Sequence, residues 1–271
     1  MTTKPVPKSP IGVFDSGLGG LTVLTALEKM LPNESFLYFG DTAHVPYGSK
    51  SADTVARYSR DILEFFLMHN TKAVVIACNT ASAVACKDLQ NSYNIPLFDV
   101  VTPSVVHSNN ISKTRSIGVI GTHSTINSGA YTQSFSDLKS DCCVIEIACP
   151  LFVPIIEEGW SDTPVAETVA NTYLEPFQET KMDTLILGCT HYPIMAKTIQ
   201  GAVENHVQLV YSGDTVGSRL RNYLEENNCK NDSGYPEKTR FYVTDFPQKF
   251  DKLGSRFLKR KMQHVEHVCL G

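Results

Sequence analysis

The chain has 271 residues, with 24 Lys and Arg against 28 Asp and Glu, and a formal net charge of −4. This length suits one large domain or two modest ones, and the charge gives no electrostatic basis for binding nucleic acid. No apolar run approaches the roughly 18 residues of a membrane-spanning helix, and the first residues lack a signal-peptide core. We therefore expect a cytoplasmic protein, with neither nucleic acid nor a membrane as partner.

The first part of the chain alternates short apolar runs with helical patterns. Strands are predicted at 11–14, 36–39, 74–77 and 95–100, and helices at about 21–30, 51–69, 79–90 and from 102. The glycine-rich turn after the first strand resembles a dinucleotide-binding loop only in part. Thr22 stands where the G-x-G-x-x-G pattern needs its last glycine, so the sequence argues against that reading.

The second part repeats the alternation of strands and helices. Strands are predicted at 116–120, 143–148, 183–188, 207–211 and 240–244, and helices at 164–180, at 212–227 and from about 245 to 261, before a short final strand. Such alternation is typical of α/β proteins with parallel sheets covered by helices on both faces.

Eight cysteines are scattered through the sequence, and no two of them form a C-x-x-C pair. A chain of this length does not need disulfides, and structural zinc sites usually contain such pairs. We therefore expect reduced thiols and no bound metal.

Two of the cysteines belong to a phrase that occurs twice. Cys78 and Cys189 each follow an apolar run, and the Ile-Gly-Val phrase at 11–13 recurs at 117–119 with a similar offset. The repeat predicts two similar α/β halves, each with a cysteine at the carboxyl end of a strand, where open sheets bind ligands.

Hydroxyl residues follow both cysteines and are candidate helix caps. Thr80 or Ser82 would cap the helix after Cys78, and Thr190 would cap the one after Cys189. A helix amino terminus favours the thiolate, so we expect this position to lower the pKa of both thiols.

The residues alone leave three interpretations of the cysteine pair open. The pair could be two buried strand-end residues without chemistry, or Cys189 and His191 could form a covalent nucleophile. A hydrolase, however, has no use for a second matched cysteine. A racemase removes a proton from one face of a carbon and returns one to the other, and thiols with an ordinary pKa of about 8.5 suit both tasks.

Four phrases, at 14–20, 40–48, 77–82 and 188–193, closely resemble those of the glutamate racemase family. The resemblance implies cofactor-independent interconversion of L- and D-glutamate, which supplies D-glutamate for peptidoglycan. It implies two pseudo-symmetric open-sheet α/β domains, 1–101 with 213–271 and 102–212, with the active site in the cleft between them. It also implies that the protein is a homodimer and that its small-molecule partner is L- or D-glutamate.

The resemblance further implies roles for single residues. Cys78 and Cys189 would donate and accept the protons, with Asp15 assisting Cys78 and His191 assisting Cys189, supported by Glu157. The implied substrate-binding set is Asp15, Ser16, Pro46, Tyr47, Gly48, Cys78, Asn79, Thr80, Thr122, Cys189, Thr190 and His191. No lysine lies in the four phrases, which agrees with the absence of a pyridoxal phosphate Schiff base.

Two alternatives to this function stay open. A relative in the same superfamily would act on aspartate or another small acid. A two-lobed amino-acid sensor without chemistry would use the same fold, although the intact cysteine pair disfavours it. Polarimetry with L-glutamate and L-aspartate separates these possibilities.

Overall fold

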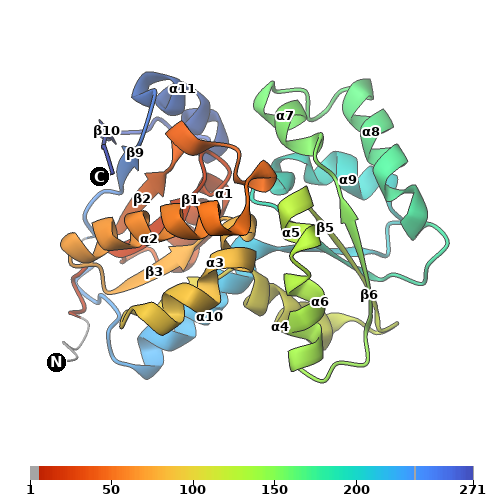
Figure 1. Cartoon of the computed structure of the whole chain (residues 1–271), viewed down its shortest axis with the longest axis horizontal. Helices are drawn as coiled ribbons and strands as arrows, with labels where there is room; N and C mark the ends of the chain where they lie inside the picture. The colour runs from red at the N-terminus through yellow and green to blue at the C-terminus, as the bar shows by residue number, and fades with distance from the viewer. Residues whose placement is uncertain (1–5, 235, 271) are drawn as a thin grey trace.

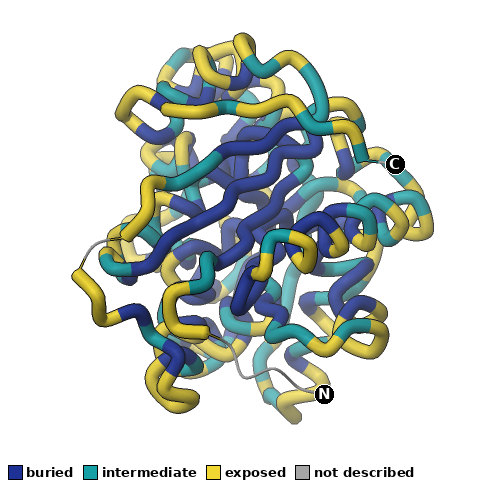
Figure 2. Tube along the Cα trace, turned by 90° about the vertical axis from the view of Figure 1, so that its left-hand side faces the viewer, coloured by how far each residue is buried: buried dark blue, intermediate teal, exposed yellow. Residues whose placement is uncertain are grey.

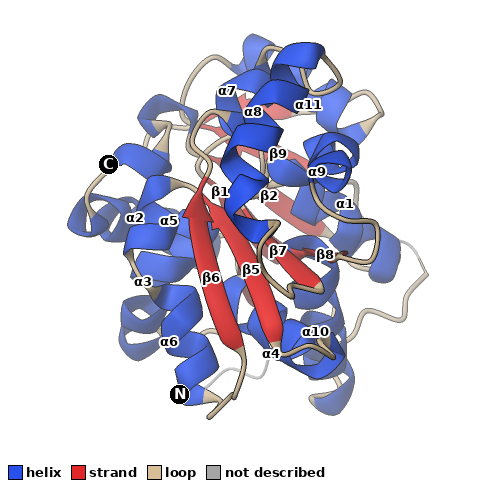
Figure 3. Cartoon of the chain, turned by 90° about the vertical axis from the view of Figure 1, so that its right-hand side faces the viewer, coloured by secondary structure: helices blue, strands red, loops and turns tan. Residues whose placement is uncertain are grey.

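Two parallel β-sheets, each covered by helices, make up the molecule (Figures 1 and 3). The computed structural model describes residues 6–234 and 236–270. The first sheet has the order β10-β9-β2-β1-β3-β4 and the second the order β6-β5-β7-β8. The strands of the first sheet are β1 (Ile11–Asp15), β2 (Phe36–Gly40), β3 (Ala73–Ile76), β4 (Leu97–Asp99), β9 (Arg240–Val243) and β10 (Val265–His267). The strands of the second sheet are β5 (Ser116–Gly121), β6 (Cys143–Ala148), β7 (Thr184–Gly188) and β8 (Gln208–Tyr211).

The two sheets share one strand order. The run β2-β1-β3-β4 of the first sheet corresponds to β6-β5-β7-β8 of the second, and all of these pairs are parallel. The strand before each repeated cysteine, β3 or β7, therefore occupies the same place beside the central strand β1 or β5. This arrangement confirms the predicted α/β fold with two pseudo-symmetric open sheets.

Helices cover both faces of the first sheet because its strands are apolar on both sides. Ile11 and Val13 pack into a cluster with α1 (Leu21–Met30), α10 (Ser212–Glu226) and α11 (Pro247–Leu258). Phe14 faces the opposite cluster, which α2 (Ala52–Met68) and α3 (Asn79–Ser92) cover. Figure 2 shows the resulting layer of buried strands between the helices.

The second sheet is covered in the same way. One face packs against α7 (Phe152–Glu157), α8 (Pro164–Leu174) and α9 (Ala196–Ala202), and the other against α4 (Val101–Ile111) and α6 (Ala130–Asp137). Thus α4 leaves the first sheet directly after β4 and packs on the second. After β8, α10 returns and packs on α1. The short helix α5 (His123–Asn127) follows β5 and contacts α3 of the first half.

The predicted strands are all present, with bounds that differ by one or two residues at most ends. The helix predicted at 164–180 ends at Leu174 and continues only as a 3₁₀ turn (Glu175–Phe177), because Pro176 cannot donate an intrahelical hydrogen bond. Among the helices of residues 6–234 and 236–270, none combines the length and the hydropathy of a membrane-spanning segment.

Candidate active site

The two repeated cysteines lie at corresponding strand ends, as predicted. Cys78 follows β3 and Cys189 follows β7, and their exposed fractions are only 5% and 6%. Asp15 ends the neighbouring strand β1, and Thr122 follows the neighbouring strand β5. Each half thus presents a thiol beside polar groups at the carboxyl edge of its sheet, which is the usual ligand site of an open α/β sheet.

Cys78 itself is the cap of helix α3. Its Sγ accepts a hydrogen bond from the Ala81 N–H at 3.5 Å, whereas the predicted caps Thr80 and Ser82 lie inside the helix. The predicted lowering of this thiol's pKa is also wrong. Burial, followed by the charge of Asp15, raises the pKa of Cys78 to about 12, and the bond from Ala81 opposes this only in part. The Ser16 Oγ lies 3.9 Å from Cys78 Sγ.

Asp15 joins the two halves of the molecule. Its fully buried carboxylate accepts hydrogen bonds from the Gly17 N–H at 2.9 Å and from the Thr190 hydroxyl at 3.3 Å. The prediction that Thr190 caps a helix is therefore wrong, and the following 3₁₀ helix begins only at Tyr192. The Thr190 carbonyl also accepts a 2.8 Å bond from Thr22 of helix α1. Thr190 is thus fixed to the first half by two hydrogen bonds.

Glu157 and His191 lie together, although they are far apart in the sequence. His191 Nε2 and Glu157 Oε1 are 3.0 Å apart. Burial acts to lower the pKa of His191, but its interactions with Cys189 and Glu157 prevail and raise that pKa to about 10. The hydrogen bond with His191 lowers the pKa of Glu157. Both groups are therefore charged near neutral pH, with the imidazolium beside Cys189.

The backbone of the glycine-rich turn in the first half lies close to Thr190 and His191 of the second half. A Cβ atom at Gly19 would overlap Thr190 and His191. The Phe257 ring of α11 also packs edge-on against His191, with their ring centroids 5.8 Å apart. The glycine-rich turn therefore serves as a contact surface for the second half.

Three threonine hydroxyls meet across the junction between the two halves. Thr80 of α3 lies 3.0 Å from Thr122, the cap of α5, and both lie within 3.1 Å of Thr125. Sequence reasoning included Thr80 and Thr122 but missed Thr125. The signal was available, because a residue three positions after a helix cap lies on the same side of the first turn.

The predicted loop at Pro46, Tyr47 and Gly48 packs on the second half by its backbone. A Cβ at Gly48 would lie 2.8 Å from Thr122 Cβ. The Tyr47 side chain is buried and donates a 2.5 Å hydrogen bond to Asp41, which is not one of the predicted site residues. Asp41 also accepts bonds from His44 and Thr244, so this carboxylate holds the loop.

Asn79 is buried beside Cys78 and is held by its amide nitrogen. This nitrogen donates to the Tyr131 hydroxyl at 2.9 Å and to the Ser212 hydroxyl at 3.2 Å. The amide oxygen has no hydrogen-bond partner among residues 6–234 and 236–270. The side chain therefore depends on Tyr131 and Ser212 for its position.

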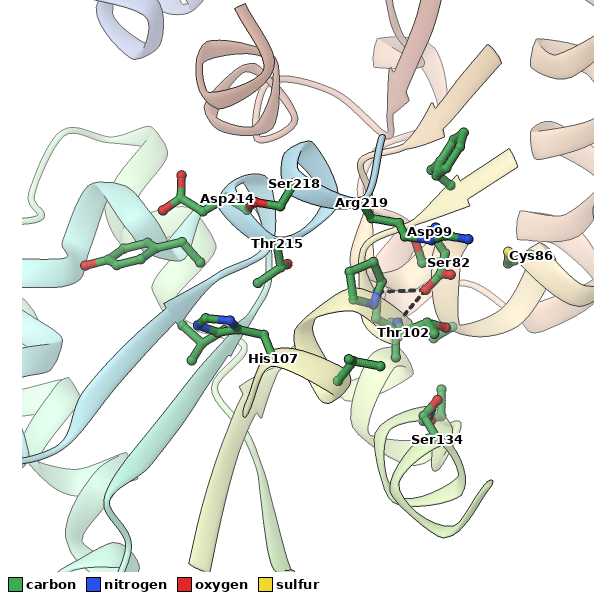
Figure 4. A pocket seen from close by; sticks show the side chains of 18 of the residues that line it. Ser82, Cys86, Asp99, Thr102, His107, Ser134, Asp214, Thr215, Ser218 and Arg219 are labelled. Carbon is green, nitrogen blue, oxygen red and sulfur yellow. Dashed lines mark hydrogen bonds between the residues drawn. The ribbon is translucent and has the colours of Figure 1, made fainter. Parts of the chain in front are cut away.

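A large cavity of about 1130 Å³ lies apart from this cluster (Figure 4). It is bordered by α3, α4 and α10, and residues such as Cys86, Asp99, His107 and Arg219 line it. None of the predicted site residues lines this cavity. Across the described ranges, no three His, Cys, Asp or Glu side chains cluster in a way that would hold a metal ion.

Comparison with known proteins identifies the family. The Asp/Glu/hydantoin racemase family model matches residues 11–216. The chain is 44% identical to a glutamate racemase of Syntrophus aciditrophicus over 261 residues, which are 96% of this chain and 97% of that relative. The chain therefore belongs to the Asp/Glu/hydantoin racemase family. Within it, the chain groups with the glutamate racemases.

Solved structures support this placement. The fold matches glutamate racemase from Francisella tularensis in complex with D-glutamate with a TM-score of 0.90 and 41% identity, covering 98% of this chain and 99% of that one. It matches glutamate racemase from Thermus thermophilus in complex with β-chloro-D-alanine with a TM-score of 0.89 and 42% identity, covering 98% of both chains.

Proposed function

We propose that this enzyme interconverts L- and D-glutamate by a two-base reaction in which Cys78 and Cys189 act on opposite faces of the α-carbon. The observation that carries the proposal is the matched placement of two buried thiols at corresponding strand ends. Each thiol has a different charged assistant, Asp15 beside Cys78 and the His191–Glu157 pair beside Cys189. The glutamate racemase of Francisella tularensis, which was solved with D-glutamate, has the same fold.

The charges at the two thiols favour one starting state. Cys78, with its pKa raised to about 12, is a thiol at neutral pH, whereas the positive charge of His191 lies beside Cys189. The Cys189 thiolate would take the α-proton of L-glutamate, and the Cys78 thiol would give its proton to the opposite face of the carbanion. One turnover exchanges the protonation states of the two thiols, so the reverse reaction starts from the product state. Before the next L-glutamate reacts, Cys189 loses its proton to solvent and Cys78 regains one, so the cycle needs no cofactor.

The polar groups around the thiols suit a substrate with two carboxylates and one ammonium group. We assign this binding to Ser16, Asn79, Thr80, Thr122 and Thr190, together with the loop at Pro46, Tyr47 and Gly48. Hydroxyls and backbone N–H groups at helix starts bind carboxylates well. Since the Tyr47 hydroxyl is bonded to Asp41, the loop would act through its backbone.

We place the substrate between two domains, 1–101 with 213–271 and 102–212. The proposal includes a homodimer in the cytoplasm and a role in supplying D-glutamate for peptidoglycan. These assignments follow from the resemblance to glutamate racemases.

The test is racemisation followed by circular dichroism with purified protein and no added cofactor. L-glutamate should lose its optical activity while L-aspartate keeps it, and treatment with EDTA and hydroxylamine should leave the rate unchanged. If aspartate is converted faster than glutamate, the proposed substrate is aspartate instead. Dependence on pyridoxal phosphate or on a metal would refute the proposed chemistry.

A further inference from the structure

Tyr131 lies behind both thiol turns. It is the second residue of α6, a helix that packs beside α4 and also contacts α3 (Figure 1). Its side chain is fully buried in the cluster that also contains Val119 and Ile186 of the second sheet. A polar hydroxyl in such a place needs a partner, and its partner belongs to the other half of the molecule.

That partner is Asn79, the residue directly after Cys78. The Asn79 amide donates to the Tyr131 hydroxyl at 2.9 Å and to Ser212, the first residue of α10, at 3.2 Å. Ser212 in turn donates to the Leu187 carbonyl at 3.4 Å. Since the Asn79 oxygen has no partner in the described part of the chain, these two hydroxyls are what hold its side chain.

The same phenol touches the residue before the other thiol. A Cβ atom at Gly188 would lie 3.2 Å from Tyr131 Cε2 and 3.3 Å from its hydroxyl oxygen. These distances are shorter than a comfortable contact, so the absence of a side chain at Gly188 is what lets the phenol lie against this turn. Tyr131 thus contacts the residue after Cys78 through its hydroxyl and the residue before Cys189 through its ring.

We propose that Tyr131 is a positioning residue that fixes the spacing of the two thiol turns across the junction between the halves. The inference rests on the function proposed above. Proton transfer depends steeply on the distance between donor and acceptor, so a small shift of either turn lowers the rate. The hydroxyl controls the Cys78 turn, and the ring supports the Cys189 turn.

Tyr131 does not transfer a proton in this scheme. Burial is the main cause of its raised pKa, and the charges of Asp99 and Glu146 contribute. The hydroxyl therefore stays neutral at the pH where the thiols work. Its effect on turnover must pass through Asn79 and the backbone beside it.

The test variant is Tyr131→Phe, which keeps the ring against Gly188 and removes only the bond to Asn79. We expect kcat to fall roughly tenfold in both directions. This is about the effect of losing one net hydrogen bond together with a small displacement of the Cys78 turn. Tyr242→Phe is the matched control. Tyr242 is also buried, in strand β9 of the first sheet, and it should keep wild-type kinetics.

Primary isotope effects on kcat/KM separate positioning from a general loss of structure. Loosening only the Cys78 turn makes its proton transfer more rate-limiting. With Tyr131→Phe, the effect of α-deuteration should therefore grow for D-glutamate, the enantiomer assigned to Cys78, and shrink for L-glutamate. Ser212→Ala, which removes the other acceptor of the Asn79 amide, should shift both isotope effects in the same directions. A smaller fraction of folded protein would lower the rate and leave both isotope effects unchanged.

Several results would overturn the inference. The first is a Tyr131→Phe variant with the kcat, KM and isotope effects of the wild type. The second is a variant that is slower but has both isotope effects unchanged. The third is an isotope effect that shrinks for D-glutamate and grows for L-glutamate. If the wild-type protein does not racemise glutamate, the proposed function fails first. If wild type is active and the variant matches it, only the role of Tyr131 is refuted.

Discussion

The Thr190 hydroxyl donates a 3.3 Å hydrogen bond to the buried Asp15 carboxylate. Thr190 follows Cys189 in the second half, whereas Asp15 ends the strand beside the Cys78 turn in the first. Asp15, the acid that we assign to Cys78, is therefore hydrogen-bonded to Thr190, the residue after Cys189. This hydrogen bond links the two strand ends directly.

Replacing Asp15 by Asn should lower turnover at least about tenfold, which is the size expected when an acid–base assistant is lost. The side chain keeps its volume and can still accept from Gly17, so the fold should persist. Steady-state rates with both enantiomers measure the effect. Asp88→Asn, at an exposed ion pair with Arg60, is the control and should keep its activity. Wild-type turnover in Asp15→Asn would remove Asp15 from the mechanism.

Serine at either cysteine should abolish racemisation in both directions, because a hydroxyl is far too weak an acid to replace the thiol. One-sided deprotonation should survive at the untouched cysteine. A glutamate analogue with a leaving group on the β-carbon reports this, since loss of the α-proton then expels that group.

With this analogue, Cys78→Ser should process the L-form and fail on the D-form, and Cys189→Ser should do the opposite. The comparison of the two mutants serves as its own control. Equal processing of both enantiomers by either mutant would contradict the two-base assignment.

The raised pKa of His191, caused by its interactions with Cys189 and Glu157, predicts a specific dependence of stability on pH. The pKa of His191 is raised from 6.5 to about 10 in the folded state, so its contribution is complete below pH 6.5 and is lost as the pH rises towards 10. The difference in unfolding free energy between wild type and His191→Asn should therefore shrink across this range. Urea unfolding at several pH values measures it.

The exposed neighbour Glu158 offers a control for this experiment. Glu158→Gln should show no matching loss between pH 6.5 and 10. A constant difference between wild type and His191→Asn over that range would mean that His191 is not held as a cation in the folded protein.

Thr125→Val should weaken substrate binding, because it removes the hydroxyl that bonds to Thr80 and Thr122 without changing the shape of the side chain. We expect KM for glutamate to rise about fivefold, the value of one net hydrogen bond, with a smaller change in kcat. Thr168→Val, on an exposed face of α8, is the matched control. An unchanged KM in Thr125→Val would show that Thr125 does not position the Thr80 and Thr122 hydroxyls for substrate binding.

The sequence predicted the strands and their repeat because apolar runs and turn residues are local signals. It could not predict that Cys78 caps its own helix, since Thr80 and Ser82 looked better as caps. It also gave the wrong direction for the pKa of Cys78. A helix start favours the thiolate, but burial and the nearby Asp15 outweigh it, and burial is a property of the whole fold.

The contacts between the two halves could not be predicted from the sequence either. The pairing of His191 with Glu157 came only from the resemblance to a family, and Asp41, Thr125 and Tyr131 received no role. Each of these three bonds to a partner that is close in space but far away in the sequence: Asp41 to Thr244, Thr125 to Thr80 and Tyr131 to Asn79. Local patterns carry no information on such long-range partners, although the spacing of Thr125 from the helix cap Thr122 was a local signal.

The order of strands in the first sheet has a consequence for how the chain is made. Strand β9 pairs with β2, and β10 pairs with β9, although both strands come at the end of the chain. During synthesis, the outer edge of β2 therefore stays unpaired until the whole second sheet has emerged, and unpaired edges invite association with other chains. The second sheet comes from one continuous segment and can form earlier. Nascent chains that stop before β9 should be the form that most needs protection from aggregation.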